Sequence, residues 1–254
     1  MKRLIAFDLD GTLAQSKQAI DAEMAALLSR LLEVAQVAVI SGGDWPQFEQ
    51  QLVRGMLEAS QFSRLFLLPT SGAKLYRYQR GWHCADAQMF SESERARIIA
   101  ALTSAQIALN LNGDASWGEK IEDRGTQITF SGLGQQAPLE AKQRWDADFA
   151  KRRALQAHLI PLLPDFSVKI GGSTSIDITR LGVDKAFGIG KLAEASGIAV
   201  ADMIFVGDAL YPGGNDYVVL ATGVAAIAVR DVEETKRVVE TMICCLDGAQ
   251  NAAR

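Results

Sequence analysis

The sequence contains few of the residues that build disulfide frameworks or zinc sites. Of its 254 residues only two are histidines and three are cysteines, at Cys84, Cys244 and Cys245. Their odd number and the absence of a C-x-x-C pair indicate neither a disulfide framework nor a zinc site. Free cysteines suit a reducing compartment, so we expect a cytoplasmic protein.

Long apolar runs are also missing. The apolar stretch that begins at Leu4 is broken by Asp8 and Asp10, too early for the core of a signal peptide. No later segment offers the roughly 18 uninterrupted apolar residues that a membrane span needs. We therefore expect a soluble chain with no membrane partner.

A basic excess is absent as well. The chain has 26 lysines and arginines against 30 aspartates and glutamates, a net charge of -4. Nucleic-acid-binding domains usually concentrate positive charge, so nucleic acid is not an expected partner. The content of 48% hydrophobic and 22% charged residues is instead typical of folded globular proteins. The length allows one large domain, or a core with an inserted smaller one.

Both ends of the chain show alternating strand and helix patterns. The apolar runs Leu4–Leu9 and Val34–Ile40 enclose apolar residues at helical spacing from Ile20 to Leu32. The further elements expected are a helix over 45–59, a strand over 65–68, a helix over 186–196 and strands over 203–206 and 224–229. This alternation predicts a doubly wound, Rossmann-like α/β core whose parallel sheet is shared by the two ends of the chain.

The middle of the chain has a different texture. Helical stretches near Glu92–Leu109 and Leu139–Leu155 alternate with short strand-like runs at Ile128–Phe130 and Ser175–Ile178. Mixed content of this kind suits a separate antiparallel layer. We therefore predict a core of residues 1–81 and 183–254, with an inserted α/β cap domain over residues 82–182.

Polar residues follow several predicted core strands where those strands end. Asp8 and Asp10 follow the first strand, Ser41 and Gly42 follow the second, and Asp208 follows a later one. Reactive groups of open parallel sheets gather at the carboxyl ends of the strands, so these residues are expected to face one crevice. Two carboxylates such as Asp8 and Asp208 can hold one magnesium ion, Mg2+, and leave positions for water and a phosphate.

The same residues suit phosphoryl transfer. A carboxylate can attack phosphorus, and Asp8 is the predicted nucleophile. Asp10, two residues on, can protonate the leaving oxygen and later deprotonate the acceptor. Thr12 can donate a hydrogen bond to phosphate, and Lys185 can neutralise charge on the transferred group. These assignments predict an Mg2+-dependent enzyme that acts on a phosphorylated small molecule.

These motifs resemble those of the haloacid dehalogenase superfamily: the Asp-x-Asp-Gly-Thr loop at Asp8, then Ser41, Lys185 and the Gly-Asp pair at Asp208. The large insertion between the second and third motifs is similar to the superfamily's subclass IIB, which carries an α/β cap. Residues 207–216, Gly-Asp-Ala-Leu-Tyr-Pro-Gly-Gly-Asn-Asp, resemble the eukaryotic-type phosphomannomutases most closely.

The resemblance implies more specific roles. Asp208 and Asp8 would be direct metal ligands, and Asp10 would add its backbone carbonyl. Asn215 and Asp216 would support the groups around the metal. Ser41 and Gly42 would contact the phosphate, and a cap-to-cap homodimer would be expected.

The cap departs from the phosphomannomutase pattern. Arg124 lies in a segment that resembles the family's cap, and Ser175 and Asp177 match its Ser-x-Asp contact to the sugar. However, Trp117, Gln135 and Ile170 stand where the mutases carry further arginines, and Thr129 replaces their asparagine. A bisphosphate needs those charge-assisted bonds far more than a monophosphate does. The cap therefore favours a phosphatase that hydrolyses a sugar phosphate.

Two other functions stay open from the sequence alone. The first is a phosphomannomutase or hexose-phosphate mutase, which residues 212–216 and Arg124 favour. The second is a non-catalytic module that senses a phosphorylated sugar. The intact pair Asp8 and Asp10 speaks against that module.

Overall fold

A seven-stranded sheet organises the larger of two units in this computed structural model. The structure describes residues 2–58, 60–113, 116–171 and 173–252. The core unit comprises Met1–Ala87 and Asp184–Arg254, and the cap unit comprises Gln88–Val183. No helix in the described part of the chain is both long and apolar enough to span a membrane.

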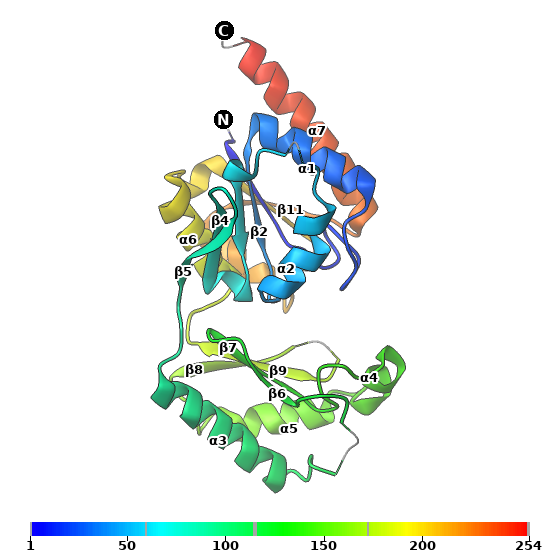
Figure 1. The fold of residues 1–254 in the computed structure, drawn as a ribbon, viewed down its shortest axis with the longest axis vertical. Coiled ribbons are helices and arrows are strands. Elements are labelled where there is room, and N and C mark those ends of the chain that lie inside the picture. Colours follow the sequence, from blue (N-terminus) through cyan, green and yellow to red (C-terminus); the bar gives the residue numbers. More distant parts are fainter. Residues whose placement is uncertain (1, 59, 114–115, 172, 253–254) are drawn as a thin grey trace. The chain divides into compact units, whose positions relative to one another are not determined.

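Among its described residues, the core unit has seven strands and four α-helices, with five 3₁₀ turns (Figure 1). The strands are β1 (Leu4–Phe7), β2 (Gln36–Ile40), β3 (Leu65–Leu68), β4 (Lys74–Tyr78), β5 (Trp82–Ala87), β10 (Met203–Gly207) and β11 (Ala225–Ala228). The helices are α1 (Ala22–Val34), α2 (Trp45–Gln51), α6 (Lys185–Ser196) and α7 (Val232–Ala252). The 3₁₀ turns are Val53–Gly55, Phe62–Arg64, Thr70–Gly72, Val200–Asp202 and Tyr217–Thr222.

The strand order β11-β10-β1-β2-β3-β4-β5 places the first strand at the centre of the parallel part. Strands β11 to β3 are parallel, and β4 and β5 add an antiparallel edge. Phe7 is paired in register with both Val39 of β2 and Val206 of β10. The loops after these three strands therefore leave the sheet at the same edge, as a doubly wound sheet requires. The predicted α/β fold class is confirmed.

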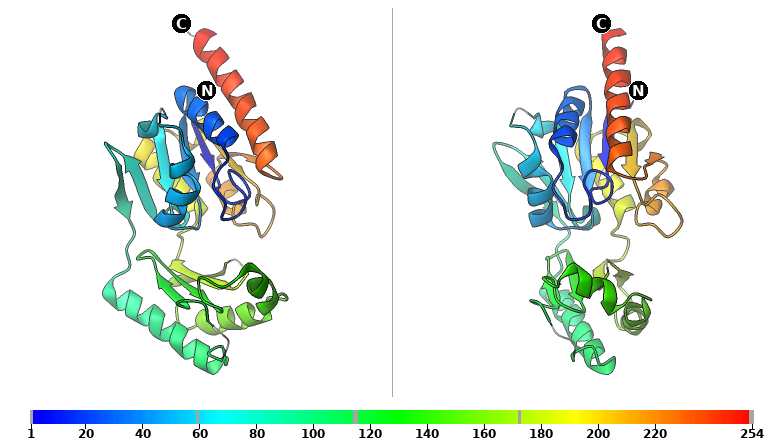
Figure 2. Two further views of the ribbon diagram at one scale, coloured as in Figure 1. Left: turned by 45° about the vertical axis from the view of Figure 1, so that its right-hand side comes forward. Right: turned by 90° about the vertical axis from the view of Figure 1, so that its right-hand side faces the viewer.

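Helices cover both faces of the core sheet (Figure 2). Ile5 and Phe7 of β1 pack in one apolar cluster with α1, α2 and α7, whereas Leu4 and Ala6 pack in a second cluster with α6. Alternate residues of a strand point to opposite faces, so a strand that is apolar throughout must be covered on both sides. Burial on both faces holds β1 in place, and with it the start of the loop that carries Asp8 and Asp10.

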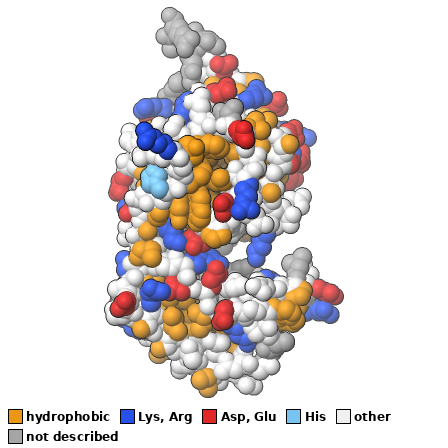
Figure 3. All heavy atoms as spheres, in the orientation of Figure 1, with side chains coloured by type: hydrophobic (Ala, Val, Ile, Leu, Met, Phe, Trp, Pro, Cys, Tyr) orange, Lys and Arg blue, Asp and Glu red, His pale blue; other side chains and the backbone are white. Residues whose placement is uncertain are grey.

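The antiparallel edge carries an aromatic cluster. Trp45 of α2 stacks on Tyr76 of β4 at 4.2 Å between ring centroids, and Trp82 of β5 lies 5.8 Å from Trp45. Hydrophobic side chains gather on this face of the core unit, over β4 and α2 (Figure 3). These contacts anchor the start of α2 to the sheet.

The predicted domain boundary at residue 82 is wrong by one strand. Residues 82–87 form β5, which pairs antiparallel with β4, so they belong to the core and the cap begins at Gln88. The second boundary lies after Val183 rather than after residue 182. The sequence of β5, WHCADA, is mostly polar or small, and half-exposed edge strands lack a clear apolar alternation.

The cap unit is a four-stranded antiparallel sheet with helices on one face. Its strands follow the order β6-β7-β9-β8, with bounds β6 (Ile121–Asp123), β7 (Gln127–Ser131), β9 (Ser175–Arg180) and β8 (Phe166–Ile170). Its helices are α3 (Glu92–Ala108), α4 (Leu139–Trp145) and α5 (Ala150–Leu159). Ile128, Phe130, Ile176 and Ile178 join the helices in one apolar cluster. The intervening residues of β7 and β9 are polar and lie on the opposite face of the sheet.

Two predicted helices are shorter than expected. The helix predicted over 139–155 is divided into α4 and α5. The backbone leaves the helical conformation at Asp146 (φ −151°, ψ 55°), and Phe149, with a left-handed φ of 65°, precedes the start of α5. The helix predicted over 45–59 ends at Gln51.

Candidate active site

Asp8 follows β1 directly and is 3% exposed. Its Oδ1 accepts a hydrogen bond from Lys185 Nζ at 2.6 Å. Lys185 is the first residue of α6, and Asp184 caps that helix by accepting from the backbone N–H groups of Ala186 and Phe187. Lys185 also donates to Asp216 Oδ1. One buried cation therefore lies between two buried carboxylates.

Burial governs the ionisation of this trio. Desolvation raises the pKa of Asp8 to about 7, with Asp216 adding to the rise and Lys185 opposing it. Burial alone would lower the pKa of Lys185, but Asp8 and Asp216 outweigh it and raise the pKa. Lys185 thus stays protonated while Asp8 titrates close to neutrality. A further cation beside Asp8 would favour its ionised form.

Three carboxylates form a cluster that fits a hard cation. Asp8, Asp208 and Asp216 each offer an oxygen, and these oxygens lie within 4.8 Å of one another. Oxygens that share one Mg2+ lie up to about 4.2 Å apart, so small side-chain shifts suffice. Both oxygens of Asp216 already accept hydrogen bonds, from Lys185 and the Ala209 amide, which suits a supporting role. Asn215, its predicted companion, is solvent-exposed.

The Asp-x-Asp-Gly loop approaches Asp208 closely. Gly11 has a φ of +87°, and a Cβ at this position would lie 2.6 Å from Asp208 Oδ2. Only glycine combines this conformation with this contact. The Thr12 hydroxyl donates to Asp208 Oδ1 at 3.3 Å and accepts from the Asp208 amide at 3.1 Å.

In the structure the Thr12 hydroxyl is engaged with Asp208, and its contact with phosphate stays a prediction. Thr12 is fully buried, and its hydroxyl joins the loop after β1 to the loop after β10. The two loops adjoin because β1 and β10 are paired neighbours. Thr12 fixes the position of Asp208, a metal-ligand candidate.

The side chain of Asp10 is not part of the carboxylate cluster of Asp8, Asp208 and Asp216. Its carboxylate accepts hydrogen bonds from the Lys17 amide and from the side-chain amides of Gln47 and Gln51. The two glutamines were not among the predicted site residues. Their spacing of four residues places them on one face of α2, but nothing in the sequence connects that face with Asp10.

The loop after β2 is hydrogen-bonded to the turn after β3, whose backbone is strained. Ser41 is 4% exposed, its amide donates to the Leu68 carbonyl, and its carbonyl accepts from the Ser71 amide. Thr70 and Ser71 have left-handed φ values of 49° and 58°, which residues with a Cβ rarely adopt. Gly42 is exposed at the turn. Ser41 is thus fixed at the same sheet edge as Asp8.

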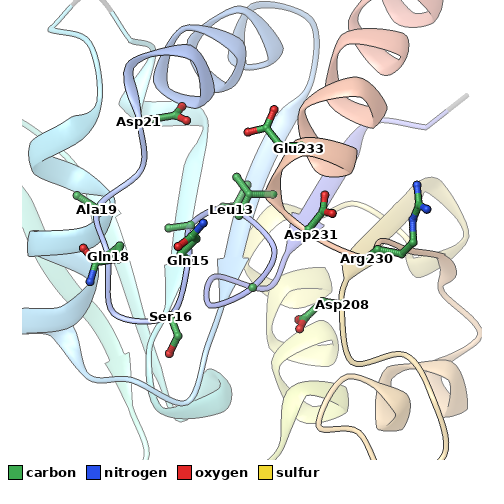
Figure 4. Close-up of a pocket in the computed structure, with 13 residues that line it drawn as sticks. Leu13, Gln15, Ser16, Gln18, Ala19, Asp21, Asp208, Arg230, Asp231 and Glu233 are labelled. Carbon is green, nitrogen blue, oxygen red and sulfur yellow. The ribbon is translucent and has the colours of Figure 1, made fainter. Parts of the chain in front are cut away.

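A cavity of about 580 Å³ adjoins this loop cluster within the core unit. It is lined by eight residues between Gly11 and Asp21 in the loop after β1, by Asp208, and by residues 230–233 at the start of α7 (Figure 4). Four carboxylates, those of Asp21, Asp208, Asp231 and Glu233, and the guanidinium of Arg230 border it.

The predicted cap residues form their own polar network. Asp177 Oδ1 accepts from the Thr129 hydroxyl at 2.8 Å and from Gln127 Nε2 at 2.9 Å. Burial raises the pKa of Asp177, although these hydrogen bonds and the nearby Arg124 oppose the rise. Arg124 pairs with Glu122 at 2.7 Å. Ser175 lies two residues before Asp177 on β9, on the same face of the sheet.

Comparisons with known proteins agree on the family. The family model of eukaryotic phosphomannomutases matches residues 24–245. The phosphomannomutase of Schizosaccharomyces pombe is 28% identical over 223 residues, which cover 85% of this chain and 84% of that protein. Phosphomannomutase 1 of Mus musculus is also 28% identical and covers 86% of this chain and 83% of the relative.

Solved structures share the fold. An IMP-nucleotidase of Plasmodium falciparum aligns with a TM-score of 0.69 at 14% identity, over 94% of this chain and 69% of that one. A haloacid dehalogenase-like hydrolase of Bacteroides thetaiotaomicron aligns with a TM-score of 0.69 at 16% identity, over 95% of this chain and 100% of that one. At these identities the likeness concerns the fold alone.

Proposed function

Since the chain belongs to the eukaryotic phosphomannomutase family, within the haloacid dehalogenase superfamily, we propose that it is a hexose-phosphate mutase that works through Asp8. The relatives support a mutase better than the phosphatase that the cap composition favours. The observation that carries the proposal is the buried trio of Asp8, Lys185 and Asp216 beside Asp208.

In the first step, a carboxylate oxygen of Asp8 attacks the phosphorus atom, and the bond from phosphorus to the sugar oxygen breaks. The leaving oxygen takes a proton from Asp10, so that the sugar departs as an alcohol. Lys185 neutralises negative charge that the phosphoryl group brings beside Asp8. The phosphoryl group is then held on Asp8 as an acyl phosphate.

In the second step, a sugar hydroxyl attacks the phosphoaspartate while Asp10 takes its proton, which restores Asp8. A phosphatase differs only in that water is the acceptor. The carboxylates of Asp8 and Asp208, with the backbone carbonyl of Asp10, are the groups that we propose hold Mg2+. Bound there, Mg2+ would offset the repulsion between the phosphate and the carboxylate.

We assign recognition of the sugar to the polar face of the cap sheet. The Asp177 carboxylate, oriented by Thr129 and Gln127, can accept from sugar hydroxyls, and Ser175 offers a further hydroxyl. Arg124 supplies a cation for a phosphate. We also propose a cytoplasmic location, which the free cysteines suit, and a homodimer formed through the cap, as the resemblance implies.

A sugar-phosphate phosphatase is the second candidate, and a specific observation favours it. Trp117, Gln135 and Ile170 occupy cap positions where the family pattern has arginines. A cap with fewer cations holds a second phosphate more weakly, so the bisphosphate intermediate of a mutase would escape more readily.

One experiment separates the candidates. The purified protein is incubated with Mg2+ and a panel of hexose 1- and 6-phosphates, with and without a hexose bisphosphate, and isomers and free phosphate are both measured. A mutase forms the isomer, with stimulation by the bisphosphate and little free phosphate. Release of phosphate without isomer establishes the phosphatase. Ligand-dependent stabilisation without either product would instead indicate a sensing module.

A further inference from the structure

Helix α2 presents two glutamine side chains to the proposed acid/base residue. Gln47 and Gln51 are four residues apart on this helix and therefore lie on one face. Gln47 Nε2 donates to Asp10 Oδ2 at 2.8 Å, and Gln51 Nε2 donates to Asp10 Oδ1 at 3.1 Å. The backbone amide of Lys17 adds a donor to Oδ1 at 2.8 Å. Each carboxylate oxygen of Asp10 is thus held by one side chain of α2.

Gln51 is a buried polar side chain at a position where an apolar side chain would pack without leaving a polar atom unpaired. It is 2% exposed, and its Oε1 has no hydrogen-bond partner among the residues that the structure describes. Leaving an amide oxygen buried and unpaired disfavours the folded state, and an apolar side chain of similar size would avoid this. Besides Asp10, Gln51 Nε2 donates only to the Gln18 carbonyl, at 2.9 Å, among the contacts of the described residues. Its donor group is the feature that an apolar residue could not supply.

Gly43 leaves the space that the Gln47 amide occupies. A Cβ at Gly43 would lie 2.0 Å from Gln47 Oε1 and 2.5 Å from its Cδ. Any other residue at this position would displace the amide from Asp10. The loop that carries Ser41 and Gly42 is therefore also shaped to admit Gln47.

We propose that Gln47 and Gln51 are positioning residues that fix the Asp10 carboxylate for proton transfer. The inference rests on the proposed function, in which Asp10 exchanges a proton with the oxygen that leaves or attacks phosphorus. A carboxylate that rotates freely is in line with that oxygen for only part of the time. Two neutral amide donors restrain the rotation and add no charge that would compete with Lys185.

The test uses leaving groups that differ in their need for a proton. Gln47→Met and Gln51→Met remove the donors at nearly constant volume, and Gln50→Met is the matched control on the exposed side of the same helix. Leaving-group release in a single turnover is measured for a hexose phosphate and for p-nitrophenyl phosphate. The sugar alkoxide must be protonated as it leaves, whereas p-nitrophenolate departs without a proton.

We expect release of the sugar to slow about ten- to a hundredfold in both variants, with KM changed less than about threefold. Release of p-nitrophenol should stay within about threefold of the wild type, and Gln50→Met should match the wild type for both substrates. Thermal unfolding of each variant checks the fold. Gln47 is half-exposed, so Gln47→Met keeps the test valid even if Gln51→Met unfolds.

A second set of variants displaces the Gln47 side-chain amide from Asp10 without removing it. Gly43→Ala should slow sugar release by about as much as Gln47→Ala does. In the double variant, Gly43→Ala should add little to the effect of Gln47→Ala, because the Gln47 amide with which the new Cβ would clash is no longer there. Additive effects, or equal slowing of both substrates, or no slowing, would overturn the inference while the proposed function stands. A wild-type protein that turns over no phosphate ester would overturn the proposed function and the inference with it.

Discussion

The core and the cap hold their polar groups in different ways. In the core, Asp8, Lys185 and Asp216 are almost fully buried and joined by contacts between full charges. In the cap, Asp177 is held by the neutral groups of Thr129 and Gln127. Charges buried together in the core suit the transfer of a charged group, whereas neutral donors on the cap sheet suit recognition of hydroxyls. The contrast agrees with our proposal that the core carries out the chemistry and the cap recognises the sugar.

The largest expected effect lies in the core. Asp8→Asn removes the proposed nucleophile, and turnover should fall by a factor on the order of 10⁴ in either a mutase or a phosphatase assay. The fold should survive, because an amide is easier to bury than a carboxylate. Rapid-quench trapping of labelled phosphate on the protein, present in the wild type and absent in Asp8→Asn, checks the role directly. Substantial turnover by Asp8→Asn would contradict the assignment.

Lys185→Met should impair both catalysis and stability. It leaves Asp8 and Asp216 buried without their cation, and breaking such a contact costs about 3 kcal/mol of unfolding free energy. Turnover should drop by a factor on the order of 10³. The control is Lys191→Met on the same helix, whose partner Asp86 is partly exposed; its cost should stay below about 1 kcal/mol in urea unfolding. Equal losses in both variants would argue against a special role for Lys185.

Asp177→Asn tests the cap side of the comparison. The change weakens an acceptor for the sugar but leaves the core untouched, so KM should rise about tenfold while kcat changes less than about threefold. Asp165→Asn, at an exposed cap position paired with Arg97, is the matched control and should leave both constants unchanged. A fall in kcat with constant KM would place Asp177 in the chemical step instead.

The last prediction is a pH dependence that arises from Asp8 in the core. Burial raises the pKa of Asp8 from 3.8 to about 7 in the metal-free protein, so the folded state binds this proton more tightly than the unfolded chain does. Metal-free stability should therefore fall as the pH rises from about 4 to about 7. Mg2+ affinity should rise over the upper part of this range, about tenfold per unit below pH 7, with a plateau above it.

Calorimetric titration with Mg2+ from roughly one unit below to one unit above the Asp8 pKa, about pH 6 to 8, measures this slope. Asp8→Asn should lose the pH dependence, while Asp177→Asn should keep it. Equal slopes in wild type and Asp8→Asn would show that another group titrates.

Much of the core could be predicted from the sequence, because each reactive position follows an apolar run. Asp8, Ser41 and Asp208 come directly after β1, β2 and β10, which are paired neighbours whose ends coincide in a parallel sheet. The local pattern of an apolar run followed by a polar residue therefore predicted which distant residues meet at one edge of the sheet. The roles of these residues in catalysis stay predictions until the variants are measured.

The partners of these residues could not be predicted in the same way. Gln47 and Gln51 look like the solvated face of a helix until the fold brings Asp10 beside them. Likewise, Asp146 resembles an ordinary helical residue, yet its carboxylate accepts from the amides of Lys151 and Arg152 near the start of α5. The glutamine contacts arise only in the tertiary structure, and the Asp146 contacts arise from the local loop before α5; apolar periodicity reports neither kind.

Asp184 marks the point where the chain re-enters the core unit. That unit resumes at Asp184, one residue before Lys185. Asp184 accepts hydrogen bonds from the backbone amides of Ala186 and Phe187, so the residue at which the chain enters the core also fixes the first turn of α6. The position of Lys185 beside Asp8 is therefore set by hydrogen bonds within the core unit itself.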